Sequence, residues 1–305
     1  MSKHPVKLIV NPYADLGRAW RATADLRPVV DEIGGADWSG TVYPTHAIEI
    51  ARDAAEEGYE TVIAVGGDGT VHEVVNGLMQ AQTSKRPRLG IVPMGSGNDF
   101  AYSLGIPRDP AEALRRIKIA SPHPIDVAHL QDNHGRTEYW NNTLGIGFDT
   151  TVTLRSRKVP FLTGFPVYFI AVVQTILLNH DALHMQITTD RETWEDDLLA
   201  LVLCNGSREG GGFRVSPNSS PNDGTLDYMS VRKISRPRMF RILPELMKGT
   251  HARFPEVRMG SFTHFNVQSK QPMIIHVDGE IYSGFGSTVD QIDVDILSSA
   301  LDVLL

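Results

Sequence analysis

An apolar segment that runs into three glycines and an aspartate constrains this chain most strongly. Residues 61–65 are continuously apolar, as in a buried parallel strand, and residues 66–70 (Gly-Gly-Asp-Gly-Thr) lead into helical spacing over residues 70–79. Glycines let the backbone approach a phosphate closely, and a helix N-terminus favours anions. A carboxylate there would repel phosphate unless it ligates Mg²⁺ or takes part in proton transfer. The pattern therefore predicts a phosphate-binding loop with a functional Asp68; a tight turn with Asp68 as N-cap is the alternative.

A second glycine-rich loop repeats this arrangement. Residues 89–92 are typical of a short strand, and residues 93–99 (Pro-Met-Gly-Ser-Gly-Asn-Asp) precede another helical segment. Ser96 and Asn98 offer side-chain hydrogen bonds, and the glycines expose backbone N–H groups. Asp99 either caps the following helix or belongs to the water shell of a Mg²⁺ ion. Because ligands bind beyond the carboxyl ends of parallel strands, we expect both loops to face one crevice.

Strand-like and helix-like segments alternate through the first part of the chain. This alternation predicts a mostly parallel sheet with helices on both faces. The expected strands are residues 7–10, 41–43, 61–65 and 89–92, and the expected helices are residues 17–33, 47–57, 70–79, 99–104 and 110–119.

The pattern changes after about Ser121, where short strands separated by turn signals predominate. The expected strands are residues 126–130, 137–140, 183–188, 197–205, 225–231, 262–267 and 273–277, with helices only at 167–178 and 237–248. The fold class predicted is therefore α/β, with an N-terminal Rossmann-like nucleotide-binding domain and a C-terminal antiparallel β-sandwich domain. We assign residues 1–124 to the first domain, together with returning strands at about 290–305, and residues 125–289 to the second.

Composition excludes several classes of protein. The chain has 305 residues and a net charge of -7, which argues against a dedicated nucleic-acid binder. The single cysteine, Cys204, lies in an apolar run; it cannot form an internal disulfide and is expected to be buried, which fits the cytosol. The N-terminus lacks the plan of a signal peptide. Residues 159–178 are apolar but interrupted by Gly164, Pro166 and Gln174, so we expect no transmembrane segment there but a core or lipid-contacting helix.

Further motifs complete an ordered set along the chain. They are Asn11-Pro12 with Gly17; residues 66–78; residues 95–101; residues 142–149 (Asn-Thr-Leu-Gly-Ile-Gly-Phe-Asp); Asn222-Asp223-Gly224; and residues 277–280 (Val-Asp-Gly-Glu). In this order the motifs resemble the diacylglycerol kinase catalytic-domain family, which also contains sphingosine and ceramide kinases and bacterial lipid kinases. The resemblance implies that a nucleotide-binding domain and a β-sandwich domain form the active site between them.

The resemblance also implies roles for individual residues. ATP would be held by Asn11, Gly66, Gly67, Asp68, Gly69, Thr70, Gly95, Ser96, Gly97 and Asn98. Asp278 is the candidate general base that takes the proton of the lipid hydroxyl, and a hairpin turn is its structural alternative. Glu280 and Asp68 would share the Mg²⁺ or orient the hydroxyl. Asp68, Asp99, Asp126 and Asp223 are the candidate metal ligands, although Ser220 stands where a second carboxylate is expected near Asp223.

Three hypotheses follow. The first is an ATP- and Mg²⁺-dependent kinase that phosphorylates diacylglycerol or a related lipid alcohol in phospholipid biosynthesis, and that is cytoplasmic and peripheral to the membrane during catalysis. The second is an NAD kinase-like phosphotransferase, and the third is a non-catalytic lipid-binding protein. The acceptor lipid and a homodimeric state stay open. His46, His72, His180, His184 and His276 show no metal-ligand spacing and are expected to be structural or exposed.

Overall fold

The computed structural model describes residues 5–159 and 164–305. The chain divides into two compact units, Met1–Ile125 with Ser299–Leu305 and Asp126–Ser298. Two strands belong in part to each unit: β5 (Pro122–Asp132) and β15 (Gln291–Leu304). The returning strands predicted at about 290–305 are thus one continuous strand.

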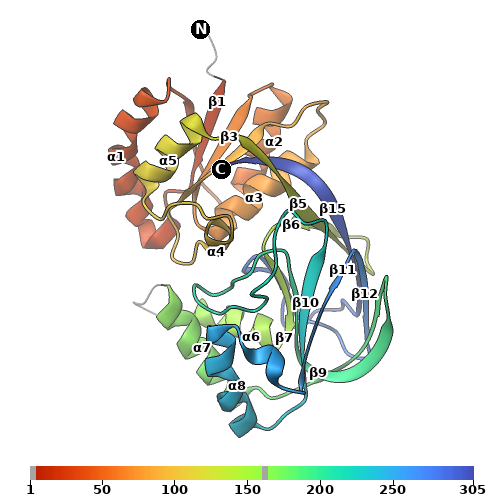
Figure 1. Cartoon of the computed structure of the whole chain (residues 1–305). Coiled ribbons are helices and arrows are strands. Elements are labelled where there is room, and N and C mark those ends of the chain that lie inside the picture. The colour runs from red at the N-terminus through yellow and green to blue at the C-terminus, as the bar shows by residue number, and fades with distance from the viewer. Residues whose placement is uncertain (1–4, 160–163) are drawn as a thin grey trace. The chain divides into compact units, whose positions relative to one another are not determined.

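The first unit is a parallel sheet with helices on both faces. Its strands follow the order β4-β3-β1-β2, all in parallel, and Val303 of β15 pairs with Leu89 of β4. Helices α1 and α5 cover one face of the sheet, and α2 and α3 cover the other (Figure 1). The elements are β1 (Val6–Val10), a 3₁₀ turn (Ala14–Gly17), α1 (Arg18–Glu32), β2 (Asp37–Gly40), α2 (His46–Glu56), β3 (Thr61–Gly66), α3 (Asp68–Gln80), β4 (Arg88–Pro93), α4 (Asp99–Ser103) and α5 (Pro110–Ile119).

One strand of this unit was placed wrongly from the sequence. The apolar residues 41–43 were expected to form the second strand, but that strand is β2, and Asp37 to Gly40 pair with Lys7 to Val10 of β1. Val42 is instead 70% exposed. The strand lies at the edge of the sheet, where burial does not select an apolar sequence.

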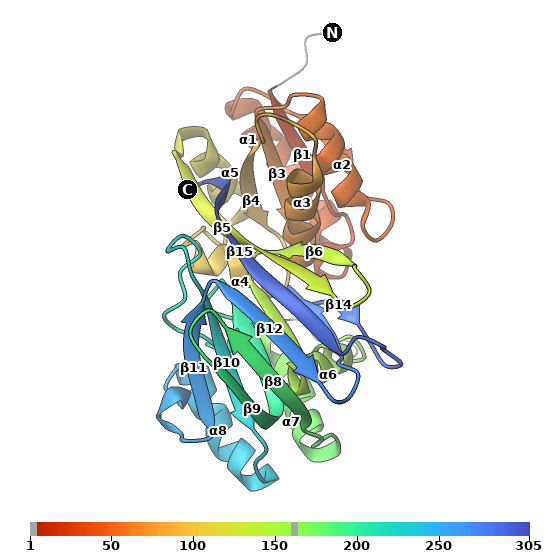
Figure 2. The ribbon, with the colours of Figure 1, turned by 90° about the vertical axis from the view of Figure 1, so that its right-hand side faces the viewer.

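The second unit is built mainly from antiparallel strands. Its further strands are β6 (Thr137–Trp140), β7 (Thr143–Gly147), β8 (Leu183–Thr189), β9 (Thr193–Cys204), β10 (Leu226–Arg232), β11 (Val257–Phe262), β12 (His264–Ser269), β13 (Ile275–Val277) and β14 (Glu280–Ser283), with helices α6 (Phe148–Ser156), α7 (Phe165–Leu178) and α8 (Arg236–Lys248) and a 3₁₀ turn (His251–Arg253). Strand β9 pairs with β7, β8 and β10. Strand β8 pairs in turn with β12, and the two lie side by side in Figure 2.

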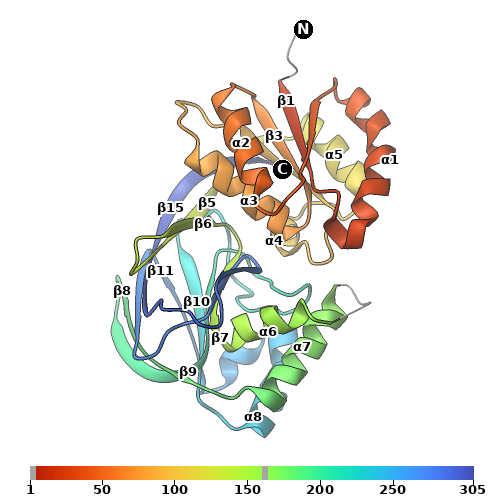
Figure 3. The ribbon, with the colours of Figure 1, turned by 180° about the vertical axis from the view of Figure 1, so that it is seen from behind.

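Two apolar layers hold the second unit together. One lies inside the β-structure and contains Trp140, Phe262 and Phe265. The other joins β9 and β10 to α6, α7 and α8, which lie close together in Figure 3. Cys204 is fully buried in this second layer, as expected. The predicted fold class, an α/β domain followed by a domain of mainly antiparallel strands, is confirmed.

Helix α6 was not predicted. Its sequence includes Thr150, Thr151, Val152 and Thr153, and β-branched residues disfavour a helix slightly. All four of these side chains are buried, so tertiary packing outweighs the local preference. None of the described helices is both long enough and apolar enough to span a membrane.

Candidate functional site

The two glycine-rich loops of the first unit are in direct backbone contact. A Cβ atom added to Gly95 would lie 2.3 Å from Cα of Gly67, and one added to Gly67 would lie 3.0 Å from Cα of Gly95. Met94 also donates its N–H to the carbonyl of Gly66, at 2.7 Å. Only glycines permit so close an approach, so the sequence brings the ends of β3 and β4 together as one loop pair.

Asn11 joins this loop pair from the end of β1. Its side-chain Nδ2 donates to Oγ1 of Thr70 at 3.1 Å, and its side-chain Oδ1 accepts the N–H of Tyr13. Thr70 is 3% exposed, and a Cβ atom on Gly66 would lie 2.3 Å from Oγ1 of Thr70. The structure thus brings together Asn11, Gly66 and Thr70, which the sequence assigned to the nucleotide.

Asn98 and Ser96 differ in their surroundings. Asn98 adopts a left-handed conformation (φ 54°), accepts the N–H of Gly95 and donates to the carbonyl of the same residue. This pair of bonds closes the second loop on itself, so Asn98 shapes the loop. Ser96 is exposed at the tip of that loop, and Gly69 lies in the first turn of α3.

Asp68 and Asp99 form a close pair of carboxyl groups at the loop pair. A Cβ atom on Gly97 would lie 2.9 Å from Oδ2 of Asp68 and 3.3 Å from Oδ2 of Asp99, so both oxygens face this glycine. Oδ1 of Asp68 accepts the N–H of Phe100 from the first turn of α4. The alternative in which Asp68 is the N-cap of its own helix is wrong, because that position belongs to Gly67.

The environment of Asp68 opposes its negative charge. Burial, followed by the nearby Asp99 carboxylate, raises the pKa of Asp68 to about 7, against the lowering effect of backbone N–H groups such as that of Phe100. Two carboxyl groups this close need a shared proton or a cation. Carboxylate oxygens are ligands that Mg²⁺ accepts, so the pair fits the metal that the kinase family implies.

Replacing Asp68 by Asn should stabilise the protein at alkaline pH and leave it nearly unchanged at pH 4. The folded pKa of about 7 lies above the ordinary value of 3.8, so this carboxyl group costs stability as pH rises between these values. The Asn side chain keeps the acceptor for Phe100. In denaturant unfolding, Asp68→Asn should have a free energy of unfolding higher than that of the wild type by on the order of 3 kcal/mol at pH 8, and an equal one at pH 4.

The matched control is Asp25→Asn, which changes an exposed carboxylate on α1. It should alter the free energy of unfolding neither at pH 4 nor at pH 8. Added Mg²⁺ should stabilise the wild type at pH 8 and reduce its deficit relative to Asp68→Asn. Equal stability of wild type and variant at both pH values would contradict the paired-carboxyl account.

The rest of the motif that follows the first loop has a packing role. Glu73 accepts the N–H groups of Thr45 and Ala47, and so caps α2. A Cβ atom on Gly77 would lie 2.3 Å from the carbonyl oxygen of Ile48, so this glycine lets α3 pack closely against α2. These residues hold the helix that begins at Asp68.

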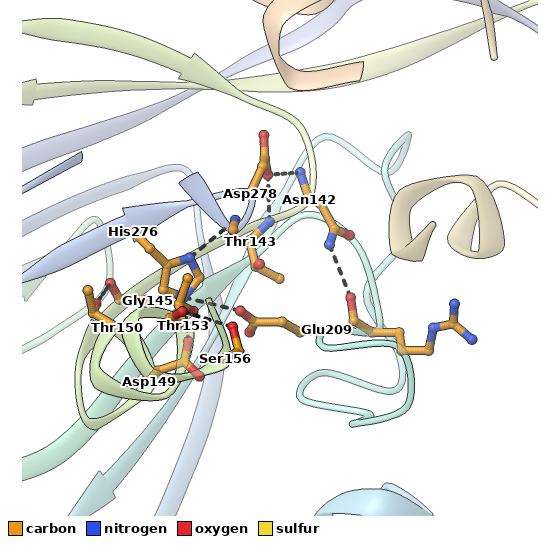
Figure 4. A network of polar contacts seen from close by, with 12 residues as sticks. Asn142, Thr143, Gly145, Asp149, Thr150, Thr153, Ser156, Glu209, His276 and Asp278 are labelled. Atoms are coloured by element: carbon orange, nitrogen blue, oxygen red, sulfur yellow. Dashed lines mark hydrogen bonds and ion pairs between the residues drawn. The ribbon is translucent and has the colours of Figure 1, made fainter. Parts of the chain in front are cut away.

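Three backbone N–H groups anchor the carboxylate of Asp278 in the second unit. Its Oδ1 accepts the N–H groups of Asn142 (2.8 Å) and Thr143 (3.0 Å), and its Oδ2 accepts that of Asn141 (3.1 Å). The side chain is 5% exposed, and Figure 4 shows it above the Asn142–Thr143 backbone. Asp278 and Gly279 both have positive φ (50° and 83°), so the residues do form a tight turn between β13 and β14. The turn fixes the position of the carboxylate.

Glu280 lies immediately after this turn in a different environment. Its carboxylate accepts a hydrogen bond from Arg157 at 2.7 Å, and the same guanidinium donates to the carbonyl of Gly279 at 2.8 Å. Both side chains are nearly half exposed. Arg157, at the end of α6, therefore braces the turn that carries Asp278.

Asp126 and Asp223 meet at one turn of the second unit. Asp126 is 1% exposed, its Oδ2 accepts the N–H of Gly224, and its own N–H donates to the carbonyl of Pro221. Asp223 is exposed and accepts the N–H and hydroxyl of Thr225. Asp126 thus contacts the backbone beside Asp223.

The sequence did not reveal a buried cluster of Asp149, Glu209 and His276. His276 is fully buried, and its Nε2 lies 2.7 Å from Oδ2 of Asp149 and 3.1 Å from Oε1 of Glu209 (Figure 4). A Cβ atom on Gly145 would lie 2.1 Å from the Asp149 oxygen, so the cluster requires a glycine there. The three residues come from distant segments, so no local spacing could have predicted their contact.

His276 is charged in this cluster at neutral pH. Burial disfavours the charged ring, but the carboxylates of Glu209 and Asp149 outweigh it and raise the pKa of His276 to about 10. One ligand atom from each of these three residues also lies close enough to the other two for the group to hold a metal ion. The imidazolium offsets one of the two negative charges, so the cluster is an ion triad around a buried cation.

Replacing His276 by Gln should destabilise the protein by about 3 kcal/mol at pH 7, because two partly buried carboxylates lose their cation. The folded pKa lies above the ordinary value of 6.5, so the stability from His276 is complete below that value and lost as pH rises through about 10. Denaturant unfolding measures the free energy of unfolding of wild type and His276→Gln. The difference between the two proteins should be smaller at pH 10.5 than at pH 7.

His184→Gln is the control, because it breaks an exposed contact with Asp197 and should have a much smaller effect. A difference between wild type and His276→Gln that is independent of pH would contradict the charged triad.

An apolar cavity of about 100 Å³ adjoins this triad. Side chains of α6, α7, α8, β9 and β10 line it, including Val172, Ile242 and Met229. Among the described residues, Asp149 and Glu209 are the acidic ones in its lining. The cavity therefore offers an apolar interior with carboxylates at its wall.

Comparisons with known proteins cover nearly the whole chain. The model of the "Diacylglycerol kinase catalytic domain" matches residues 5–130, and that of the "YegS C-terminal NAD kinase beta sandwich-like domain" matches residues 142–305. A "Probable lipid kinase YegS-like" of Chromohalobacter salexigens is 34% identical over 76% of this chain and 73% of its own. A "Diacylglycerol kinase" of Bacillus subtilis is 30% identical over 79% and 76%.

Solved structures agree with these matches. One structure of a Bacillus anthracis protein is 25% identical and covers 98% of this chain and 96% of its own, with a TM-score of 0.79. Another from the same organism, described as a diacylglycerol kinase, shares the fold with a TM-score of 0.72, 23% identity and the same coverage.

Proposed function

Because the chain belongs to the diacylglycerol kinase catalytic-domain family, we propose that it transfers the γ-phosphate of ATP to the hydroxyl group of diacylglycerol or a related lipid alcohol. The family makes it a lipid kinase. The donor, the acceptor and the residue roles are our proposal, and the contact between the two glycine loops is the observation that most directly supports it.

The donor is assigned to the first unit. The backbone around Gly67 and Gly95 lacks side chains that would keep a phosphate at a distance, and the N-terminus of α3 favours an anion. Thr70 and Asn11, which already contact each other, would orient the phosphates. Mg²⁺ bound by Asp68 and Asp99 would neutralise phosphate charge, which is the main requirement of phosphoryl transfer.

The proton acceptor is assigned to the second unit. As the lipid oxygen forms its bond to the γ-phosphorus, the bond from that phosphorus to the β,γ-bridging oxygen breaks and ADP leaves. The hydroxyl proton passes to the carboxylate of Asp278. The three N–H groups of residues 141–143 hold this carboxylate in one orientation, and Arg157 braces its turn through Gly279 and Glu280. This role for Glu280 is positioning.

The acceptor is assigned to the lipid class on the basis of the apolar cavity. A mainly apolar cavity of this kind suits a hydrocarbon segment, since engineered apolar cavities of about 150 Å³ bind benzene. Such a lipid resides in a membrane, so the proposed enzyme works at a membrane surface and contributes to phospholipid biosynthesis.

A lipid extract incubated with the protein, ATP and Mg²⁺ tests the proposal. Mass spectrometry should show lipids that gain one phosphate, and EDTA should prevent the gain. A parallel incubation with NAD should yield no NADP. NADP formation without any phosphorylated lipid would overturn the lipid assignment in favour of a NAD kinase-like activity, and ATP-independent lipid binding alone would favour a non-catalytic protein.

A further inference from the structure

Helix α7 is apolar over most of its surface. The helix, Phe165–Leu178, contains no charged residue, and Gln174 is its one exposed polar side chain with an amide. Val172 and Ile176 on its inner side are buried and line the apolar cavity. A helix with apolar side chains on both its inner and its outer side normally has both sides in a protein core or in lipid. One side of α7 is in a core, so its other side needs an explanation.

The outer side of α7 is open to solvent. Phe169 is 37% exposed, Leu177 is 55% exposed and Leu178 is 66% exposed. Pro166 and Gln174 are exposed as well, and Gln174 is the polar member of this side. Phe169 and Leu177 are eight residues apart and therefore lie on the same side of the helix. Adjacent exposed apolar side chains on one element mark an interaction surface.

Helix α8 lies beside α7 and adds cations to this surface (Figure 3). Arg236 donates to the carbonyl of Ile176, which places its guanidinium at the end of α7. Arg241 and Lys248 are exposed further along α8, and Phe240 is 38% exposed between the first two cations in sequence. Lys248 also pairs with Glu245, at 3.7 Å, whereas Arg236 is the cation that contacts α7 directly. These exposed cations contrast with the net charge of -7 of the whole chain.

We propose that the α7–α8 face, formed by Phe169, Leu177, Leu178, Phe240, Arg236, Arg241 and Lys248, docks on the surface of an anionic lipid bilayer. The 14 residues of α7 extend about 21 Å, too short for a hydrocarbon core of about 30 Å, so the helix lies in the interface. Its apolar side chains enter the boundary between head groups and acyl chains, and the cations contact anionic head groups.

The same two helices connect this face with the cavity. Val172 and Ile176 of α7 and Ile242 and Leu243 of α8 line the cavity, whereas the outer sides of both helices form the docking face. A docked protein would therefore have only this pair of helices between the bilayer and the cavity. This docking face would be the membrane-binding surface of the proposed lipid kinase. The biological purpose of docking rests on the proposed function, whereas docking itself does not.

Flotation with vesicles measures docking without any reference to catalysis. The full-length protein should float with vesicles of phosphatidylglycerol and phosphatidylcholine, and much less with phosphatidylcholine alone. The double variant Phe169→Asp/Leu177→Asp should lose at least tenfold in partitioning, because two apolar contacts are lost. Arg241→Glu should lose at least fivefold at low salt, and less at high salt.

Two matched variants control for surface charge in general. Ile119→Asp changes a side chain that is 83% exposed on α5, and Lys85→Glu changes an exposed cation; both should float like the wild type. Circular dichroism melts of all variants separate docking from unfolding. Equal flotation of wild type and Phe169→Asp/Leu177→Asp, or no flotation of the wild type, overturns the inference.

Two further outcomes are distinct. A concentration-dependent dimer that the double variant abolishes, without vesicle binding, would assign the face to a second copy of the chain and overturn docking. Flotation as expected without phosphate transfer to any lipid leaves the docking face intact and overturns the proposed function. Phosphate transfer to detergent-dispersed lipid without flotation would support the proposed function and overturn the docking face.

Discussion

Asp278→Asn should lower the rate of phosphate transfer to lipid by about 10²–10⁴-fold, the usual contribution of a general base. The amide retains one oxygen for the N–H groups of Asn142 and Thr143 and loses only the acceptor for Asn141. Asn also tolerates the left-handed backbone at this turn. The fold and the nucleotide loops should therefore survive. Initial rates at saturating ATP measure the effect, and ATP affinity should change little.

Asp181→Asn serves as the comparison, because it removes an exposed carboxylate from the same unit and should leave the rate unchanged. The effect of Asp278→Asn should persist at every pH at which the wild type is active. Transfer at the wild-type rate in Asp278→Asn would show that another group, or the solvent, accepts the proton.

Gly95→Ala should reduce kcat/KM for ATP by at least about 100-fold, since small displacements of a binding loop are that costly. The added methyl group would lie 2.3 Å from Cα of Gly67, so one of the two loops must move. Overpacking of this kind should also destabilise the protein by about 2 kcal/mol. Steady-state kinetics and denaturant unfolding measure the two effects.

Gly40→Ala is the matched control, because a Cβ atom at Gly40 meets no atom within 4 Å. It should change neither kinetics nor stability appreciably. If Gly95→Ala retained full activity, the backbone contact between the loops would have no part in nucleotide binding.

The sequence predicted those parts of the first unit that repeat a local pattern. Apolar runs ending in glycine identified β3 and β4, and Pro110 with its following residues identified α5 within its true bounds. The edge strand β2 was missed because an exposed edge leaves no apolar signature. Helix α6 was missed because its β-branched residues are helical only through packing.

The candidate site was predictable to the extent that its chemistry follows sequential motifs. The two glycine loops and Asp278 are motif residues, and the structure gives each of them a defined set of contacts. Their assigned roles remain predictions. The Asp149–His276–Glu209 triad was not predictable, because three distant segments meet only in the folded chain. Sequence reasoning placed His276 among structural residues and gave no hint of its charge.

The most direct test of the central claim is to compare ATP labelled at the γ-phosphate with ATP labelled at the α-phosphate. After incubation with Mg²⁺ and dispersed diacylglycerol or another lipid alcohol, the organic phase is extracted and counted. We expect lipid-bound label from γ-labelled ATP only, and its loss in Asp278→Asn. Label from α-labelled ATP, or no lipid-bound label from either with any lipid alcohol, would contradict the account.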